Sequence, residues 1–126
     1  MSRRMVYVVD DEDQVRESLG FLLKSLHYKC FLYRSGEEFL DVAPVLQPGC
    51  IFLDYRMSGM GGLQVLAELR RLGVHWPVAA MTGHGDDSVG VKFLALGAID
   101  YLEKPFDEDA LIRVLQRAFD QIDTAG

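Results

Sequence analysis

The sequence predicts an α/β fold in which a parallel β-sheet is covered by helices on both faces. Three observations predict it: short β-rich runs alternate with longer helical patterns five times, most of the runs are continuously apolar, and the helical patterns carry an apolar stripe. Strands buried on both faces of a parallel sheet have such runs. With 126 residues, the chain has the size of one domain.

Five strands are expected, each rich in apolar residues that favour β-structure. They cover residues 5–9, 29–33, 50–53, 78–81 and 98–102. Each strand is followed by a helical pattern. This order of elements is typical of repeated βα units with parallel strands.

Five helices are expected after these strands. Apolar residues at helical spacing mark residues 13–26 and 111–122. The second helix, 36–43, is expected to end at Pro44, and the third, 63–72, at Gly73. The fourth, 86–96, contains Gly90 and is expected to be the least stable. We assign residues 1–122 to the domain and 123–126 to a tail or the start of a linker.

Composition limits the function classes. Thirteen basic and nineteen acidic residues give a net charge of −6, which argues against direct nucleic-acid binding by this domain. The sequence contains neither a signal-peptide core nor an apolar stretch of membrane-spanning length, so a cytoplasmic protein without membrane contact is expected. Cys30 and Cys50 lack metal-site spacing and are expected to be free thiols.

Polar side chains gather where the predicted strands end. These residues are Asp10, Asp11, Asp54, Thr82 and Lys104. Singly, each has an ordinary explanation as a helix cap, a turn residue or a solvated charge. Together, three carboxylates at one edge of a sheet would repel one another unless they shared a cation, and Mg²⁺ suits oxygen ligands. A hydroxyl and an amine beside that cation would suit a phosphoryl group in transfer.

The strand ends and the turns after them resemble a known family, the response-regulator receiver (CheY-like) domains. The resemblance is carried by the acidic pair Asp10-Asp11, by Leu53-Asp54 followed by Arg56-Met57, by Met81-Thr82-Gly83, and by Glu103-Lys104-Pro105-Phe106. Residues 82–86 and 100–106 are most similar to the receivers of FixJ-type (LuxR/NarL-class) transcription regulators. The match runs through nearly the whole chain.

The resemblance implies a flavodoxin-like (βα)5 domain with strand order 2-1-3-4-5. This order would separate Cys30 and Cys50 by two strands, about 9.6 Å, which is too far for a disulfide. It also implies a cis peptide bond between Lys104 and Pro105.

The same resemblance assigns roles to the polar residues. Asp54 would accept a phosphoryl group from a sensor histidine kinase, and Thr82 and Lys104 would bind the phosphoryl oxygens. Mg²⁺, or Mn²⁺ in its place, would be held by Asp11, Asp54 and the backbone carbonyl of Arg56, with Asp10 reaching it through water.

The resemblance further implies a switch rather than an enzyme. Thr82 would move toward the phosphoryl group and Tyr101 would turn inward, which would reshape the surface formed by the fourth helix, the fifth strand and the fifth helix. Slow self-catalysed phosphorylation and dephosphorylation, a phosphorylation-dependent homodimer and an output in transcription are expected. His84 is a possible modulator of water at the site.

The chain departs from the family pattern after the phosphoacceptor. The family favours Met-Pro-x-Met-Asp-Gly, whereas residues 57–62 read Met-Ser-Gly-Met-Gly-Gly. Without the proline the loop backbone is less restricted, and Gly61 offers no side-chain cap to the third helix. We therefore expect a looser loop.

Parts of the sequence also match motifs of other function classes. Residues 11–15 satisfy the D-x-D-x-V nucleophile motif of haloacid-dehalogenase-like phosphatases, but the order of the later motifs differs. The glycines near residue 84 lack the third glycine of a dinucleotide site. A stand-alone receiver, or a phosphorelay module without a DNA-binding output, is a further alternative.

Overall fold

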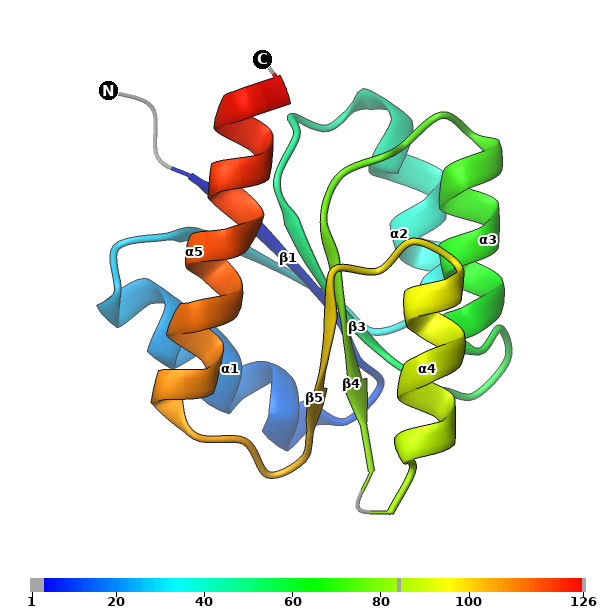
Figure 1. The fold of residues 1–126 in the computed structure, drawn as a ribbon, viewed down its shortest axis with the longest axis horizontal. Helices are drawn as coiled ribbons and strands as arrows, with labels where there is room; N and C mark the ends of the chain where they lie inside the picture. Colours follow the sequence, from blue (N-terminus) through cyan, green and yellow to red (C-terminus); the bar gives the residue numbers. More distant parts are fainter. Residues whose placement is uncertain (1–3, 84, 126) are drawn as a thin grey trace.

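The computed structural model describes residues 4–83 and 85–125, which form a parallel five-stranded sheet between two layers of helices (Figure 1). The strands follow the order β2-β1-β3-β4-β5, and each neighbouring pair is parallel. The predicted flavodoxin-like fold and strand order are confirmed. The strand bounds are β1 Met5–Val9, β2 Lys29–Tyr33, β3 Cys50–Asp54, β4 Val78–Thr82 and β5 Asp100–Glu103.

The helices divide between the two faces of the sheet. Helices α1 and α5 cover one face, and α2, α3 and α4 cover the other (Figure 1). Their bounds are α1 Asp13–Ser25, α2 Gly36–Val42, α3 Gly62–Arg71, α4 Asp87–Ala95 and α5 Glu108–Ala125. Five strands and five helices were expected, and each lies within a few residues of its predicted place.

The sheet separates two apolar cores because successive side chains of a strand point to opposite faces. In β1, Tyr7 and Val9 pack on the side of α2, α3 and α4, whereas Val6 and Val8 pack on the side of α1 and α5. All four are at most 1% exposed. This double burial explains why β1 reads as one continuous apolar run.

The second helix ends at Val42, one residue from its predicted end and ahead of Pro44. The chain then tightens into a 3₁₀ turn, Ala43–Val45, which tolerates proline in its first positions. The last helix begins at Glu108, ahead of its apolar stripe, because the Asp107 carboxylate accepts the Ala110 amide at 2.8 Å. It continues past residue 122 to Ala125, so residues 123–125 extend the helix.

The two cysteines are free thiols on different strands, as expected. Val6 pairs with Cys30 on one side and with Cys50 on the other, so β1 lies between them. Burial raises the pKa of the Cys30 thiol to about 11 and also raises the pKa of Cys50. Within residues 4–83 and 85–125, no helix is both long enough and apolar enough to span a bilayer.

Candidate functional site

The polar residues singled out in the sequence lie where the strands end, at the lower edge of the sheet in Figure 1. Asp10 follows β1, Asp54 ends β3, Thr82 ends β4 and Lys104 follows β5. Asp10, Asp54 and Thr82 are buried, with exposures of 0%, 4% and 1%. Buried polar side chains are uncommon, so three of them at one edge of the sheet mark it as a candidate site.

The amine of Lys104 lies among three carboxylates. Its Nζ is 2.8 Å from Asp10 Oδ2, 3.0 Å from Asp54 Oδ1 and 3.3 Å from Glu12 Oε1. The main chain helps to place it, because the Lys104 amide donates to the Thr82 carbonyl at 2.7 Å. The ammonium group therefore balances part of the negative charge at the strand ends.

The loop after β1 is held by hydrogen bonds of its own. Asp10 Oδ1 accepts the Glu12 amide at 2.9 Å, and the Asp10 carbonyl accepts from the guanidinium of Arg16 at 2.7 Å. Arg16 is buried on α1 and also pairs with the Asp13 carboxylate. The position of Asp10 is thus fixed from both its main chain and its side chain.

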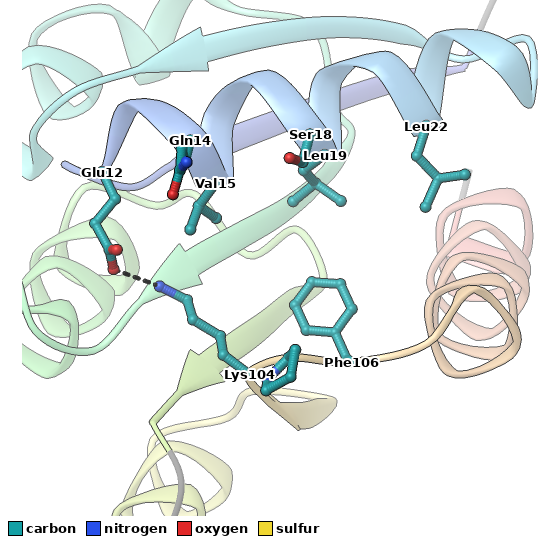
Figure 2. Close-up of a pocket in the computed structure, with 9 residues that line it drawn as sticks. Glu12, Gln14, Val15, Ser18, Leu19, Leu22, Lys104 and Phe106 are labelled. Atoms are coloured by element: carbon teal, nitrogen blue, oxygen red, sulfur yellow. Dashed lines mark hydrogen bonds and ion pairs between the residues drawn. The ribbon is translucent and has the colours of Figure 1, made fainter.

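Glu12 belongs to the acidic cluster although the sequence analysis did not select it. Among the described residues, one carboxylate oxygen each of Asp10, Glu12 and Asp54 lies within 4.8 Å of the others. Glu12 precedes α1, and its side chain turns back toward Lys104 (Figure 2). The acidic run of residues 10–13 was the available signal, but it does not specify which carboxylates turn inward.

The environment changes the acidity of Asp54. Burial, followed by the charge of Asp10, raises the pKa of Asp54 to about 6, although Lys104 acts in the opposite direction. Burial alone would lower the pKa of Lys104, but hydrogen bonds and charges from Asp10 and Asp54 outweigh it and raise that pKa. Asp54 is thus held as a carboxylate of raised basicity beside an amine that stays charged.

The second oxygen of Asp54 has no hydrogen-bond partner. Oδ1 contacts Lys104, but Oδ2 is the only fully buried side-chain nitrogen or oxygen in the described part of the chain that lacks a partner. An unsatisfied buried carboxylate oxygen is costly and calls for an explanation in a folded protein. A cation or an electrophile at this position would satisfy it.

Asp11 and Arg56 lie at the rim rather than in the cluster. Asp11 Oδ2 accepts the backbone amide of Ser58 at 2.9 Å, and Asp11 is not a member of the group formed by Asp10, Glu12 and Asp54. The Arg56 side chain is exposed and lies 3.8 Å from Asp86 at the start of α4. Gly61 is the N-cap of α3 without a side-chain hydrogen bond, as expected.

Behind the site, Tyr101 is half-buried and packs against the core on the side of α2, α3 and α4. Its ring adjoins the backbone of α4, because a Cβ built on Gly90 would lie 2.5 Å from ring atoms. The peptide bond between Lys104 and Pro105 is cis, as the resemblance implied. His84 lies outside the described residues.

A hollow of about 630 Å³ opens beside the site, between α1 and the segment after β5. Figure 2 shows Val15, Leu19, Leu22 and Phe106 around it, with the ion pair of Glu12 and Lys104 at one end. The approach to the carboxylates from this side is therefore lined by apolar side chains together with the polar Gln14 and Ser18, and ends at a charged pair.

Residues 6–116 match the family profile described as the response regulator receiver domain. The chain belongs to this family. Haloacid-dehalogenase-like and dinucleotide-binding alternatives are not supported, since the receiver match covers most of the chain. A receiver is a signalling domain, and a buried acidic cluster at its strand ends suits such a domain.

Among receivers, the chain is similar to those of FixJ transcriptional regulators. It is 48% identical over 111 residues to "Transcriptional regulatory protein FixJ" of Azorhizobium caulinodans, covering 88% of this chain and 53% of that protein. It is 39% identical over 121 residues to FixJ of Bradyrhizobium diazoefficiens, covering 96% of this chain and 59% of that protein. The chain therefore spans little more than half of these relatives.

Solved structures agree with this similarity. The crystal structure of FixJ-N superposes with a TM-score of 0.88 at 37% identity and covers 94% of each chain. Full-length FixJ from B. japonicum gives a TM-score of 0.92 at 38% identity, covering 99% of this chain and 62% of that one.

Proposed function

We propose that this receiver accepts a phosphoryl group on Asp54. The observation that carries the proposal is the state of the Asp54 carboxylate: one oxygen is bound by Lys104, and the other is buried without a hydrogen-bond partner. The lone pairs of that second oxygen are not engaged by the protein. A carboxylate with a pKa raised to about 6 is also a better nucleophile than an ordinary one while remaining ionised at pH 7.

The transfer needs little more than positioning and charge. The Asp54 oxygen attacks phosphorus, the bond from phosphorus to the donor's leaving group breaks, and an acyl phosphate forms on Asp54. Lys104 lies 3.0 Å from Asp54 Oδ1 and supplies positive charge for the phosphoryl oxygens. Thr82, buried at the end of the neighbouring strand, supplies a hydroxyl.

A divalent metal fits the residues at this edge. Three carboxylate oxygens from Asp10, Glu12 and Asp54 lie within 4.8 Å of one another, and Mg²⁺ or Mn²⁺ takes oxygen ligands. We propose Asp11, Asp54 and the Arg56 carbonyl as direct ligands, with Asp10 acting through water. When bound, the ion would neutralise the charge that gathers on the phosphoryl oxygens. Glu12 is a further carboxylate within reach of such an ion.

The output would follow from a change at α4, β5 and α5. Thr82 and Tyr101 are the proposed switch pair, and His84 remains a proposed modulator. The outer side of α4 and its C-cap expose Val91, Leu94 and Leu96, with exposures of 61%, 42% and 42%. Such an apolar surface supports a phosphorylation-dependent contact, including a homodimer.

We further propose a sensor histidine kinase as the phosphodonor and transcription as the output. The similarity to FixJ proteins, which are named transcriptional regulators, supports this output. A stand-alone or phosphorelay receiver is the alternative. Slow self-catalysed loss of the phosphoryl group would reset the switch.

Intact-mass spectrometry after incubation with acetyl phosphate tests the proposal. With Mg²⁺, the native protein should gain the mass of one phosphoryl group, and without the metal the gain should be much slower. The Asp54→Asn variant should show no gain, whereas Asp41→Asn on the exposed side of α2 should behave as the native protein. Equal labelling of Asp54→Asn would refute the assignment.

A further inference from the structure

The backbone amide of Ser58 binds the side chain of Asp11. The Ser58 N–H donates to Asp11 Oδ2 at 2.9 Å and joins two loops whose residues are 47 positions apart in the sequence. Proline, which the family pattern favours at this position, has no N–H and cannot make this bond. The hydrogen bond is therefore possible because residue 58 of this chain is not a proline.

The bond holds Asp11 apart from the other carboxylates. Lys104 contacts Asp10, Glu12 and Asp54, and the carboxylate oxygens of these three residues form the group within 4.8 Å. Asp11 lies outside that group, and its Oδ2 accepts the hydrogen bond from the Ser58 amide instead. An ion that took Asp11 Oδ2 as a ligand would compete with this amide for the same oxygen.

The loop that carries Ser58 is anchored on both sides of its tip, where Met57 and Met60 pack against the core. Gly59 has a φ of 77°, and a Cβ there would lie 2.7 Å from Glu37 Oε2. The loop closes through the Gly62 amide, which donates to the Tyr55 carbonyl at 3.0 Å. The bond to Asp11 adds a direct link from the tip of this loop to the residue that follows Asp10.

We propose that the Ser58 amide is a positioning group that competes with the divalent ion for Asp11. This inference rests on the proposed function, because it takes Asp11 as a metal ligand. The hydrogen bond stabilises the metal-free form, so it weakens metal binding by the free energy needed to break it. Metal binding would at the same time release the tip of the loop from Asp11.

Calorimetric titration with Mg²⁺ of Ser58→Pro and Ser58→Ala tests the competition. Ser58→Ala keeps the amide and is the matched control, so it should bind Mg²⁺ as the native protein does. Ser58→Pro lacks the donor and should bind about threefold to tenfold more tightly, as expected for loss of a hydrogen bond to a charged group near the surface. Equal or weaker binding by Ser58→Pro would overturn the proposal.

A proline also stiffens the loop, and a second pair of variants separates this effect. In an Asp11→Ala background, Ser58→Pro and Ser58→Ala should bind Mg²⁺ equally, because no carboxylate remains to be freed. If the proline still tightened binding there, loop stiffness would explain the gain and the competition would be wrong.

Amide hydrogen exchange at Ser58 decides the question without a proline. The amide should exchange faster in Asp11→Ala than in the native protein, and faster in the native protein once Mg²⁺ saturates it. Unchanged exchange in both comparisons would overturn the proposal. A native protein that bound no Mg²⁺ would instead count against the proposed function, while the comparison with Asp11→Ala would still test the hydrogen bond.

Discussion

The ring of Tyr101 occupies the space beside Gly90 that a side chain would need. A Cβ at Gly90 would lie 2.5 Å from three ring atoms of Tyr101, closer than carbon atoms approach. Gly90 lies within α4 and Tyr101 within β5, so the glycine lets the helix approach the strand. A residue that weakens the helix in isolation is therefore required by the packing.

Replacing Gly90 tests this contact. Alanine is favoured over glycine in a helix by about 1 kcal/mol, yet Gly90→Ala should lower the free energy of unfolding by about 1–2 kcal/mol because its methyl group overlaps the ring. In a Tyr101→Ala background the same substitution should stabilise the protein. Urea unfolding of the four proteins measures both effects. A similar gain in stability in both backgrounds would show that the contact is unimportant.

Lys104 should stabilise the metal-free fold. Lys104→Met keeps most of the apolar stem but leaves Asp10, Glu12 and Asp54 without their shared cation, and should cost about 2–4 kcal/mol at pH 7. Saturating Mg²⁺ should restore part of this loss, since a bound ion replaces the missing charge. Urea unfolding with and without Mg²⁺ measures the loss of stability in Lys104→Met and its partial recovery when the ion is bound.

Lys92→Met on the exposed side of α4 is the control for Lys104→Met. Mg²⁺ should change the free energy of unfolding of Lys92→Met by the same amount as that of the native protein. A Lys104→Met protein as stable as the native one at pH 7 would contradict the role assigned to this amine.

Asp54 should make stability depend on pH. Its pKa in the folded protein is about 6 against an ordinary value of 3.8, so the folded state holds this proton more tightly than the unfolded chain. The stabilisation is present below 3.8 and is lost as pH rises through about 6. Relative to the native protein, Asp54→Asn should therefore gain about 2 kcal/mol between pH 4 and pH 7. If the difference in the free energy of unfolding between the two proteins stayed constant from pH 4 to pH 7, the pKa of Asp54 would not be raised in the folded protein.

The thiols should react slowly. Burial raises the pKa of both, to about 11 for Cys30, so little thiolate exists at pH 8. A thiol reagent should find two free cysteines in denaturant and modify them far more slowly in the folded protein. Fewer than two in denaturant without reductant would indicate a disulfide.

The fold was predictable because its signals are local. The continuous apolar run of β1 indicates a strand that is buried on both faces, and the leucine spacing of α1 indicates a helix that is buried on one face. Gly73, with a φ of 84°, follows the end of α3, as its position in the sequence indicated. Pro44 indicated the end of α2 to within one residue, but not the 3₁₀ turn that follows, since proline also fits the first turn of a 3₁₀ helix.

The site was predictable only in part. The predicted strand ends were enough to place four polar residues at one site, because parallel strands bring their carboxyl ends to one edge of the sheet. These residues are Asp10, Asp54, Thr82 and Lys104. The inward turn of Glu12 and the bond from Ser58 to Asp11 depend on side-chain and loop conformation that no spacing rule contains. The sequence shows that residue 58 is not the proline of the family pattern, but it does not show that the amide of Ser58 binds Asp11.

Phosphorylation of the Asp54 carboxylate is the step on which the proposed function depends. The most direct measurement is to treat the protein with acetyl phosphate and Mg²⁺, reduce the acyl phosphate with borohydride, and map the product by peptide mass spectrometry. Reduction converts a phosphorylated aspartate to homoserine, and we expect this change at residue 54 alone. Homoserine at residue 10 or 11, or the reduced glutamate 5-hydroxynorvaline at residue 12, with residue 54 unmodified, would refute phosphorylation at Asp54.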